Sequence, residues 1–320
     1  MRKGFFKKMA ALVLAVVTTM TMFTGCGGAG STSASTKSIT IQGGNTEGDL
    51  DPAGVALGMF IQYSRLCLEP LITYDSDGKV SKAMAESYEE SSDGLTWTFH
   101  LRKDAKWSDG SAVTSADFVN TIKRSLDGKT SKSIYADMLS PIVGATEAYA
   151  GTASVDNVGV TAPDDYTIEF KLVKPCSYFL KLIAMQCCYP SKAGIATNEN
   201  ETWYTDPKTN LANGAFYMTE YVQGQYYKLK KNPNYYDADK VYLEDITVKF
   251  IDDATAAVSA YKTNEVDFAT NLPAYVMSEY QSKSDLVLQP NITTRFILFN
   301  VTKAPFNNDK VRSCLLYTSD

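Results

Sequence analysis

The chain has 320 residues, of which 44% are hydrophobic and 21% charged, and its formal net charge is −5. Its length allows two or three domains, and its composition is that of an ordinary globular protein. Because no basic stripe remains beyond the first residues, nucleic acid is excluded as an expected partner.

The N-terminal segment has the pattern of a secretory signal. Four basic residues among the first eight precede an uncharged apolar run, Met9 to Phe23. This run is too short to cross about 30 Å of hydrocarbon as a helix, but it has the length of a signal peptide. It ends in Phe23-Thr24-Gly25-Cys26, which resembles the lipobox of bacterial lipoproteins, whose cysteine thiol receives diacylglycerol. Cleavage before Cys26 would take the net charge from −5 to −9.

We therefore expect residues 1–25 to be a lipoprotein signal peptide, Cys26 to be the lipidation site, and residues 26–37 to be a flexible tether. Two acyl chains on one cysteine would give a stable anchor. The expected location is the cell membrane, lipid-anchored and facing the extracellular or periplasmic side. An ordinary cleaved signal with a chance cysteine is the alternative.

The five later cysteines do not predict a disulfide framework, because their number is odd and the chain is large. No CxxC spacing occurs and His100 is the only histidine, so we expect no zinc site. We interpret these cysteines as small buried hydrophobic residues. No motif of a hydrolase, phosphate loop or metalloenzyme is complete. We expect no enzyme activity, no metal ion and no cofactor.

Strands and helices alternate without an internal repeat, which favours an α/β fold. Asp93-Gly94 is a strong hairpin signal before an alternating strand, and Thr114 to Asp117 predicts a capping box. The predicted strands are 38–42, 96–101, 166–172, 246–251, a short one at 264–268 and 295–300. The predicted helices are 55–68, one that opens at 114, 178–184 and 254–261, the last capped by Asp252-Asp253.

Several sequence blocks share the motifs of one family. They are Glu69-Pro70-Leu71, Asp93-Gly94-Leu95-Thr96-Trp97-Thr98-Phe99-His100-Leu101-Arg102, Trp107-Ser108-Asp109-Gly110, Asn213-Gly214-Ala215-Phe216-Tyr217, Asn232-Pro233-Asn234-Tyr235-Tyr236 and Asn264-Glu265-Val266-Asp267. Over roughly residues 38 to 312 the chain resembles the extracellular solute-binding proteins, family 5, of bacterial peptide and nickel importers. Tyr135-Ala136-Asp137-Met138-Leu139 resembles the oligopeptide-binding branch.

The resemblance implies a bilobal, periplasmic-binding-protein type II-like fold of the large class, with an inserted extra domain. Residues 38–70 and 194–295 would form lobe I, residues 71–193 the inserted domain, and residues 296–320 the start of a truncated lobe II. Residues 313–320 do not look like the helix that the family has there. We expect most of lobe II to be absent and the chain to bind no peptide tightly.

The resemblance also implies a function. The protein would be the substrate-binding receptor of an ABC importer, a monomer that captures oligopeptides and delivers them to the permease and its ATPase subunits. A receptor of the same family for nickel-chelate, haem or another solute is the alternative, and a secreted hydrolase is a weaker one.

Similarity to the oligopeptide-binding branch implies which residues line the ligand. They are Ala56, Gly58, Arg65, Tyr135, Thr270, Asn271, Thr294 and Phe296. Arg65 would orient the cleft or meet a carboxylate, unless it forms a surface salt bridge. Tyr135 would present its ring and hydroxyl, unless it is a core aromatic residue. Asn271 would hydrogen-bond ligand main chain, unless it is a turn residue, and Phe296 stands where the branch often has tyrosine.

Overall fold

The computed structural model describes residues 37–44, 50–54, 59–75, 77–131, 133–200, 202–270, 272–288 and 297–316. The signal peptide, the lipidation site Cys26 and most of the tether lie outside these ranges, as do Ala56, Gly58, Asn271, Thr294 and Phe296. The chain divides after Asn271 into two compact units. The predicted boundaries of lobe I, the inserted domain and lobe II stay predictions. No helix within the described ranges is long and apolar enough to cross a membrane.

The predicted hairpin is present as β4 (Ala85–Glu90) and β5 (Thr96–Leu101), which pair antiparallel. Gly94 in the turn has a φ of +70°, a region that glycine enters without a Cβ penalty. The Leu95 N–H donates to the Asp93 carboxylate at 3.0 Å. The sequence signal at Asp93-Gly94 is confirmed.

This hairpin belongs to a four-stranded antiparallel sheet in the order β4-β5-β7-β6, with β7 at Thr167–Lys171 and β6 at Val160–Asp164. Along β5, Trp97 and Phe99 are buried while His100 between its neighbours is exposed. The imidazole of His100 lies 3.6 Å from the Glu89 carboxylate on the outer face. His100 is therefore a surface residue of this sheet.

Helix α3 (Ser115–Leu126) begins at the predicted capping box. The Asp117 carboxylate accepts the Thr114 N–H at 2.9 Å. It also accepts the indole N–H of Trp107 at 2.9 Å and the backbone N–H of Ala193 at 2.8 Å. Asp117 is only 1% exposed, so these three donors replace the water that a buried carboxylate would otherwise need.

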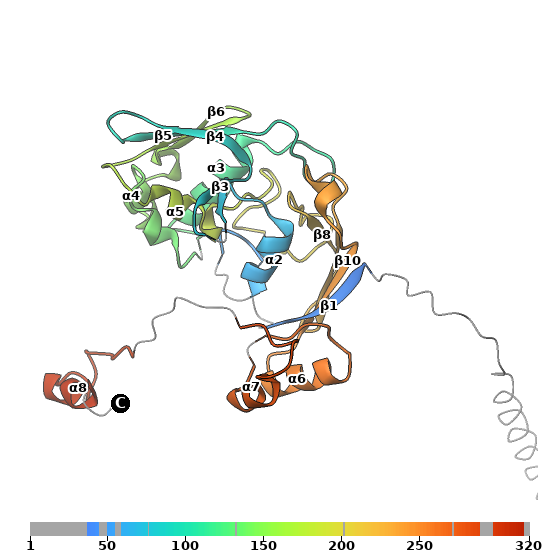
Figure 1. Cartoon of the computed structure of the whole chain (residues 1–320). Coiled ribbons are helices and arrows are strands. Elements are labelled where there is room, and N and C mark those ends of the chain that lie inside the picture. The colour runs from blue at the N-terminus through green and yellow to red at the C-terminus, as the bar shows by residue number, and fades with distance from the viewer. Residues whose placement is uncertain are drawn as a thin grey trace, which may run out of the picture. The chain divides into compact units, whose positions relative to one another are not determined.

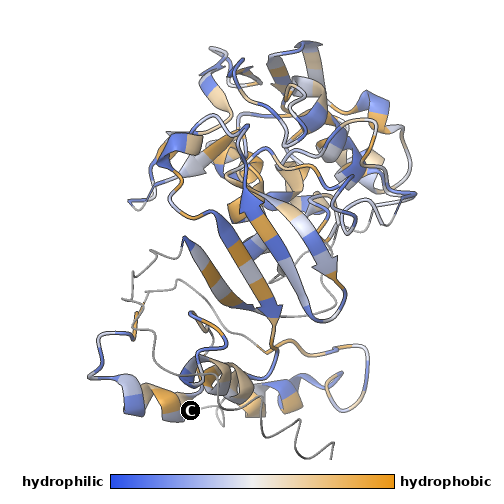
Figure 2. Ribbon diagram, turned by 90° about the vertical axis from the view of Figure 1, so that its right-hand side faces the viewer, coloured by the Kyte–Doolittle hydropathy of each residue, from blue (hydrophilic) through white to orange (hydrophobic). Residues whose placement is uncertain are grey.

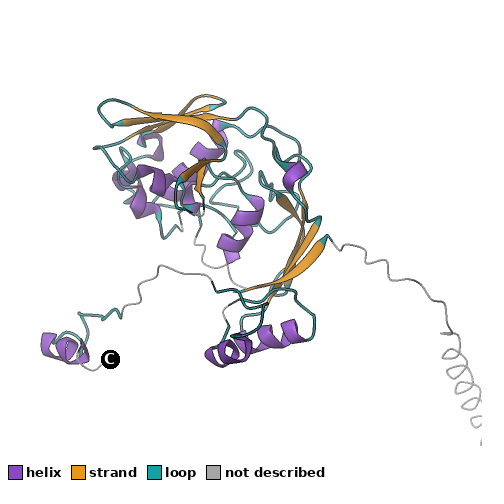
Figure 3. Ribbon diagram, viewed as in Figure 1, coloured by secondary structure: helices purple, strands orange, loops and turns teal. Residues whose placement is uncertain are grey.

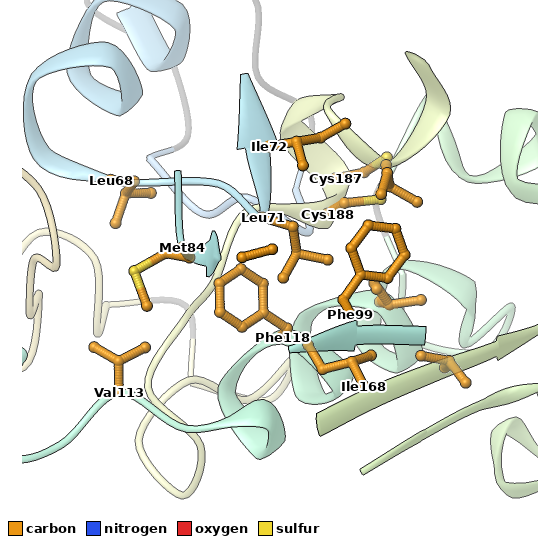
Figure 4. Close-up of a cluster of buried hydrophobic side chains, with 14 of the residues drawn as sticks. Leu68, Leu71, Ile72, Met84, Phe99, Val113, Phe118, Ile168, Cys187 and Cys188 are labelled. Atoms are coloured by element: carbon orange, nitrogen blue, oxygen red, sulfur yellow. The ribbon is translucent and has the colours of Figure 1, made fainter. Parts of the chain in front are cut away.

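The main hydrophobic core lies under this sheet. Phe99 of β5, Phe118 of α3 and Ile168 of β7 converge on Leu71, the residue before β2 (Ile72–Tyr74) (Figure 4). Each of these side chains is completely buried. The apolar face of α3 and the inward face of the strands therefore form one core.

The interpretation of the cysteines is confirmed for four of the five. Cys67, Cys176, Cys187 and Cys188 are buried thiols, and Cys314 is exposed. Figure 4 shows Cys187 and Cys188 in the same buried hydrophobic cluster as Leu71 and Phe99. Burial raises the pKa of the Cys67 thiol, which disfavours the reactive thiolate.

The second four-stranded sheet has the order β1-β10-β9-β8 and joins distant parts of the chain (Figures 1 and 3). β1 (Ser38–Gly43) pairs in parallel with β10 (Asp245–Phe250), while β9 (Tyr226–Lys231) and β8 (Phe216–Val222) continue the sheet antiparallel. Hydrophobic and hydrophilic residues alternate along its strands (Figure 2), as expected for a sheet whose two faces differ.

The remaining elements are short. They are α2 (Met59–Cys67), β2 (Ile72–Tyr74), β3 (Val80–Lys82), α4 (Ala145–Tyr149), α5 (Phe179–Ile183), α6 (Ala254–Lys262), α7 (Ala274–Tyr280), α8 (Asp309–Leu316) and the 3-10 helices η1 (Ala136–Leu139), η2 (Val155–Asn157), η3 (Gln186–Cys188) and η4 (Ala238–Lys240).

Two predictions in the C-terminal part are wrong. The strand expected at 295–300 is absent over 297–300, which has no regular structure in the described chain. An apolar pattern there cannot form a ladder without a partner strand. Residues from Ser313 were not expected to be helical, yet α8 runs to Leu316. Leucine is a good helix former, and Asp309 in the first turn favours the helix dipole.

Gly214 allows the loop before β8 to approach the end of α2. Its N–H donates to the Cys67 carbonyl at 2.9 Å, and a Cβ at this position would lie 2.7 Å from the Cys67 carbonyl carbon. Since backbone must move, Gly214→Ala should lower the free energy of unfolding by about 1–3 kcal/mol, measured by urea denaturation. Gly44→Ala is the control, because its Cβ would meet nothing within 4 Å. Equal stability of the two variants would contradict the prediction.

Candidate ligand-binding site

Three parallel chain segments end side by side at one edge of the second sheet. β1 lies between β10 and residue Phe268, which forms a parallel bridge with Ile41. α6 connects β10 to this bridge, and its N-cap Asp253 accepts the Ala256 N–H at 2.7 Å, as the sequence predicted. In open α/β sheets, ligands bind beyond the carboxyl ends of such strands.

The two helices that follow these strands cover opposite faces of the sheet. On one face, Val248 of β10 is buried and a Cβ at Gly43 would meet both Val248 and Gln62 of α2. On the other face, Lys249 pairs with Glu265, just after α6, at 2.9 Å. Figure 1 agrees, with α2 and α6 on either side of β1 and β10. The chain thus leaves β1 and β10 toward opposite faces, the topological switch point at which crevices form.

Gln42, next to the end of β1, holds this edge together. It is 3% exposed, and its backbone N–H donates to the Phe268 carbonyl at 2.9 Å. Its side-chain Nε2 donates to the Ile251 carbonyl at 2.8 Å, and its Oε1 accepts the Thr270 N–H at 2.7 Å. Its own carbonyl accepts Nε2 of Gln62 at 3.2 Å. The buried residue Gln42 therefore connects β1 with three other parts of the chain: helix α2, the segment just after β10, and residues 268–270.

One predicted ligand residue, Thr270, belongs to this edge, and a second, Arg65, lies on the neighbouring helix α2. Thr270 is half-buried and bonded to Gln42, and Arg65 lies in the last turn of α2, three residues after Gln62 and hence on the same helix face. Arg65 is exposed, and within the described chain it makes no hydrogen bond or ion pair. The surface salt bridge considered for it is therefore not formed among these residues.

Arg65 also lies within electrostatic reach of Tyr189. Burial raises the pKa of the Tyr189 hydroxyl, and the Arg65 cation opposes that shift. Tyr189 follows η3, in the part of the chain predicted to be the inserted domain. Arg65, on a helix that packs against the second sheet, thus lies close to a residue from the part of the chain that carries the first sheet.

Tyr135 is not joined to this edge by the contacts of the described chain. It precedes η1, is half-buried and packs against the main core. Its backbone contacts are local: the N–H donates to the Ser133 hydroxyl at 3.4 Å, and the carbonyl accepts the Met138 N–H at 3.1 Å. Both interpretations of Tyr135, core residue and ligand contact, stay open.

A buried ion pair, missed by the sequence reasoning, fixes the loop between β1 and α2. Asp51 and Arg124 pair directly, and their side chains are only 10% and 8% exposed. Nε and Nη1 of Arg124 donate to Asn198 Oδ1 and the Ser191 hydroxyl, both at 3.1 Å. Asp51 also accepts the Ala53 N–H at 2.9 Å. The loop that leads to α2 is thereby tied to α3.

A separate open hollow of about 460 Å³ lies along α3 and residues 193–199. Its lining includes Lys123, which faces Asp156 at 3.8 Å, and Asn120, which donates to the Ala196 carbonyl at 3.2 Å. The predicted ligand residues that the structure describes, Arg65, Tyr135 and Thr270, do not line this hollow. Its polar groups Lys123 and Asn120 already have partners. The carboxyl-end edge is the better candidate site.

Comparisons with known proteins agree on one family. Residues 79–320 match the profile described as bacterial extracellular solute-binding proteins, family 5 Middle. The periplasmic oligopeptide-binding protein OppA of Escherichia coli (strain K12) is 32% identical over 292 residues, covering 90% of this chain and 53% of OppA. The probable deoxycholate-binding periplasmic protein YgiS of the same organism is 32% identical over 279 residues, covering 85% and 51%. The crystal structure of Haemophilus influenzae OppA in complex with RPPGFSPFR has a TM-score of 0.75 and 25% identity, covering 88% of this chain and 55% of that chain.

The fold is therefore α/β and periplasmic-binding-protein type II-like, as predicted. The chain belongs to family 5 of the bacterial extracellular solute-binding proteins, a family of binding proteins rather than enzymes. It spans about half the length of the curated relatives it matches.

Proposed function

We propose that this chain is part of a receptor that binds oligopeptides for an ABC importer. The observation that carries the proposal is the edge formed by Gln42, Thr270 and Arg65, where two helices leave parallel strands toward opposite faces. The similarity to OppA supports peptides as the ligand class. Arg65 is an exposed cation that makes no hydrogen bond or ion pair within the described chain. It therefore suits the carboxylate that every free peptide carries.

Binding to the peptide main chain would allow one receptor to accept many sequences. Every peptide offers the same N–H and C=O groups, and strand-like pairing with them gives affinity that side chains do not set. Water in roomy side pockets would satisfy the side chains. Closure of two lobes about a hinge would then bury the ligand and present the loaded receptor to a permease and its ATPase subunits.

The proposal includes export and anchoring. The basic and apolar N-terminal pattern supports a signal peptide, and lipidation of Cys26 would hold the receptor at the membrane surface. Within the same frame, residues 38–70 and 194–295 would form lobe I, and residues 71–193 an inserted domain. The pairing of β1 with β10 supports a lobe built from separate stretches of the chain.

A second ligand class also fits Arg65. YgiS is described as a probable deoxycholate-binding protein, and deoxycholate carries a carboxylate but no peptide bonds. A nickel-chelate with carboxylate arms would offer the same group. The two classes differ in the main-chain amides, so an amide-specific experiment separates them.

Saturation-transfer NMR with trialanine, N-methylated trialanine, deoxycholate and a nickel-chelate tests the proposal. Because the chain spans about half the length of its relatives, the method must detect a Kd on the order of millimolar. We expect trialanine to bind, N-methylation to weaken it, and the peptide to remain uncleaved. Binding of deoxycholate or the nickel-chelate but not trialanine, or peptide hydrolysis, would overturn the proposal.

Arg65→Ala should weaken trialanine binding by about tenfold, since a charge-assisted hydrogen bond to the carboxylate is lost. The same substitution should leave binding of C-terminally amidated trialanine unchanged. Stability should change by no more than about 0.5 kcal/mol, because the side chain is exposed. Lys181→Ala, which removes an exposed cation in the last turn of α5, is the matched control. Equal losses for the free and amidated peptides would exclude the carboxylate role.

A further inference from the structure

The side-chain amide of Gln42 has a fixed orientation. Nε2 faces the Ile251 carbonyl at 2.8 Å, a group that only accepts hydrogen bonds, so this atom must be the nitrogen. Oε1 faces two donors of Thr270, its backbone N–H at 2.7 Å and its hydroxyl Oγ1 at 3.2 Å. With 3% of the residue exposed, water does not compete for these contacts.

This orientation decides what Thr270 can offer to a ligand. Both of its donors, the backbone N–H and the hydroxyl proton, are directed at Gln42. The lone pairs of Oγ1 and the carbonyl oxygen remain, and Thr270 is only half-buried. A threonine in free solution is both donor and acceptor, whereas here the residue presents acceptors.

We propose that Gln42 is a positioning residue that makes Thr270 a hydrogen-bond acceptor, so that the ligand group at this point is an N–H donor. Such a group is a peptide amide or an ammonium, and a carboxylate or carbonyl oxygen is rejected there. The inference rests on the proposed function and deepens it: Arg65 takes the ligand carboxylate, and Thr270 takes an N–H of the same ligand.

Among the substitutions of similar size, only a protonated glutamate reproduces this pair of contacts. Methionine has neither group, and asparagine is one methylene shorter. An ionised glutamate accepts from Thr270 but sets a carboxylate oxygen against the Ile251 carbonyl. A protonated carboxyl group, in contrast, donates to Ile251 and accepts from Thr270, as the amide does. Gln42→Glu therefore places the positioning function under the control of pH.

Burial and the facing carbonyl raise the pKa of the introduced carboxyl group. The folded-state pKa lies above the unfolded value, so the wild-type arrangement is kept at low pH and lost as pH rises through it. In Gln42→Glu, the NMR chemical shift of the Thr270 amide proton should change between about pH 4 and 8. Binding of trialanine should fall over the same range. Wild type and Gln225→Glu, a substitution in the exposed β8–β9 turn, should show neither change.

A second variant covers the case in which Gln42→Glu does not fold. Thr270→Val removes the acceptor oxygen while keeping the shape of the side chain. It should weaken trialanine by about threefold to tenfold and leave the analogue with the contacting amide N-methylated unaffected. Thr270→Ser should restore most of the binding.

The outcomes separate this inference from the proposed function. Suppose that wild type binds trialanine but the chemical shift of the Thr270 amide proton in Gln42→Glu does not change with pH. The inference about Gln42 is then wrong, while the proposed function stands. The inference is also wrong if Thr270→Val binds every trialanine analogue as wild type does. If wild type binds no peptide while the Thr270 amide titrates, the proposed function fails and the positioning by Gln42 is supported.

Discussion

Replacing Arg124 by methionine should lower the free energy of unfolding by about 3–5 kcal/mol, the usual cost of removing one partner of a buried ion pair. The substitution removes the cation that pairs with the Asp51 carboxylate, at a position where only 7% of the Asp51 residue is exposed. It also removes donors from Asn198 and the Ser191 hydroxyl. Urea denaturation at neutral pH measures the loss.

The double variant Asp51→Leu/Arg124→Met tests whether the loss comes from the uncompensated charge. Since removal of both charges leaves no buried ion at these two positions, we expect the double variant to be more stable than Arg124→Met alone. Lys228→Met is the exposed control. Lys228 and Glu220 also form a close pair, at 2.6 Å, but their side chains are 47% and 42% exposed, so the cost should be below about 1 kcal/mol. A similar loss for both single variants would show that burial does not decide the effect.

Local sequence patterns predicted the elements that are stabilised by their own neighbours. The hairpin at Asp93-Gly94, the capping box at Thr114 and the N-cap at Asp253 each depend on residues within five positions, and all are present. The strand expected at 295–300 depends on a distant partner. Its apolar pattern was therefore insufficient, and residues 297–300 have no regular structure.

The candidate site could be predicted only in part for the same reason. Family resemblance indicated Arg65 and Thr270, but the residue that holds Thr270 lies 228 positions earlier, at Gln42. The ion pair joins Asp51 and Arg124 across 73 positions. A polar residue at the end of an apolar strand, before Gly43-Gly44, was the available signal for Gln42. Its partners could not be read from the sequence.

These long-range contacts explain how the edge of the second sheet is held. Gln42, near the end of β1, forms hydrogen bonds to Phe268 and to Ile251, the residue just after β10. The Asp51–Arg124 ion pair connects the loop after β1 to α3. Loss of the Gln42 contacts would displace residues 268–270, whereas loss of the ion pair would displace the loop that leads to α2. The Gln42 and Arg124 variants should therefore both impair peptide binding, but only Gln42→Glu should do so in a pH-dependent manner.

Asp117→Asn should lower the free energy of unfolding by about 3 kcal/mol, although it changes the side-chain volume very little. The carboxylate accepts the Trp107 indole N–H and the Thr114 N–H on one oxygen and the Ala193 N–H on the other. Asparagine has one acceptor oxygen, so its NH₂ group must face at least one of these buried donors. Two donors then oppose each other where only 1% of the residue is exposed, and no water can relieve them.

Asp253→Asn is the matched control for this substitution. Asp253 is an exposed N-cap whose carboxylate accepts a single N–H, that of Ala256, and asparagine caps helices as well as aspartate. Its stability should therefore change by no more than about 0.5 kcal/mol. Equal losses in urea denaturation would mean that the number of donors around Asp117 is not what matters. A large loss at Asp117 alone would show that a residue predicted from its place in a capping box also connects α3 to Trp107 and to the loop at Ala193.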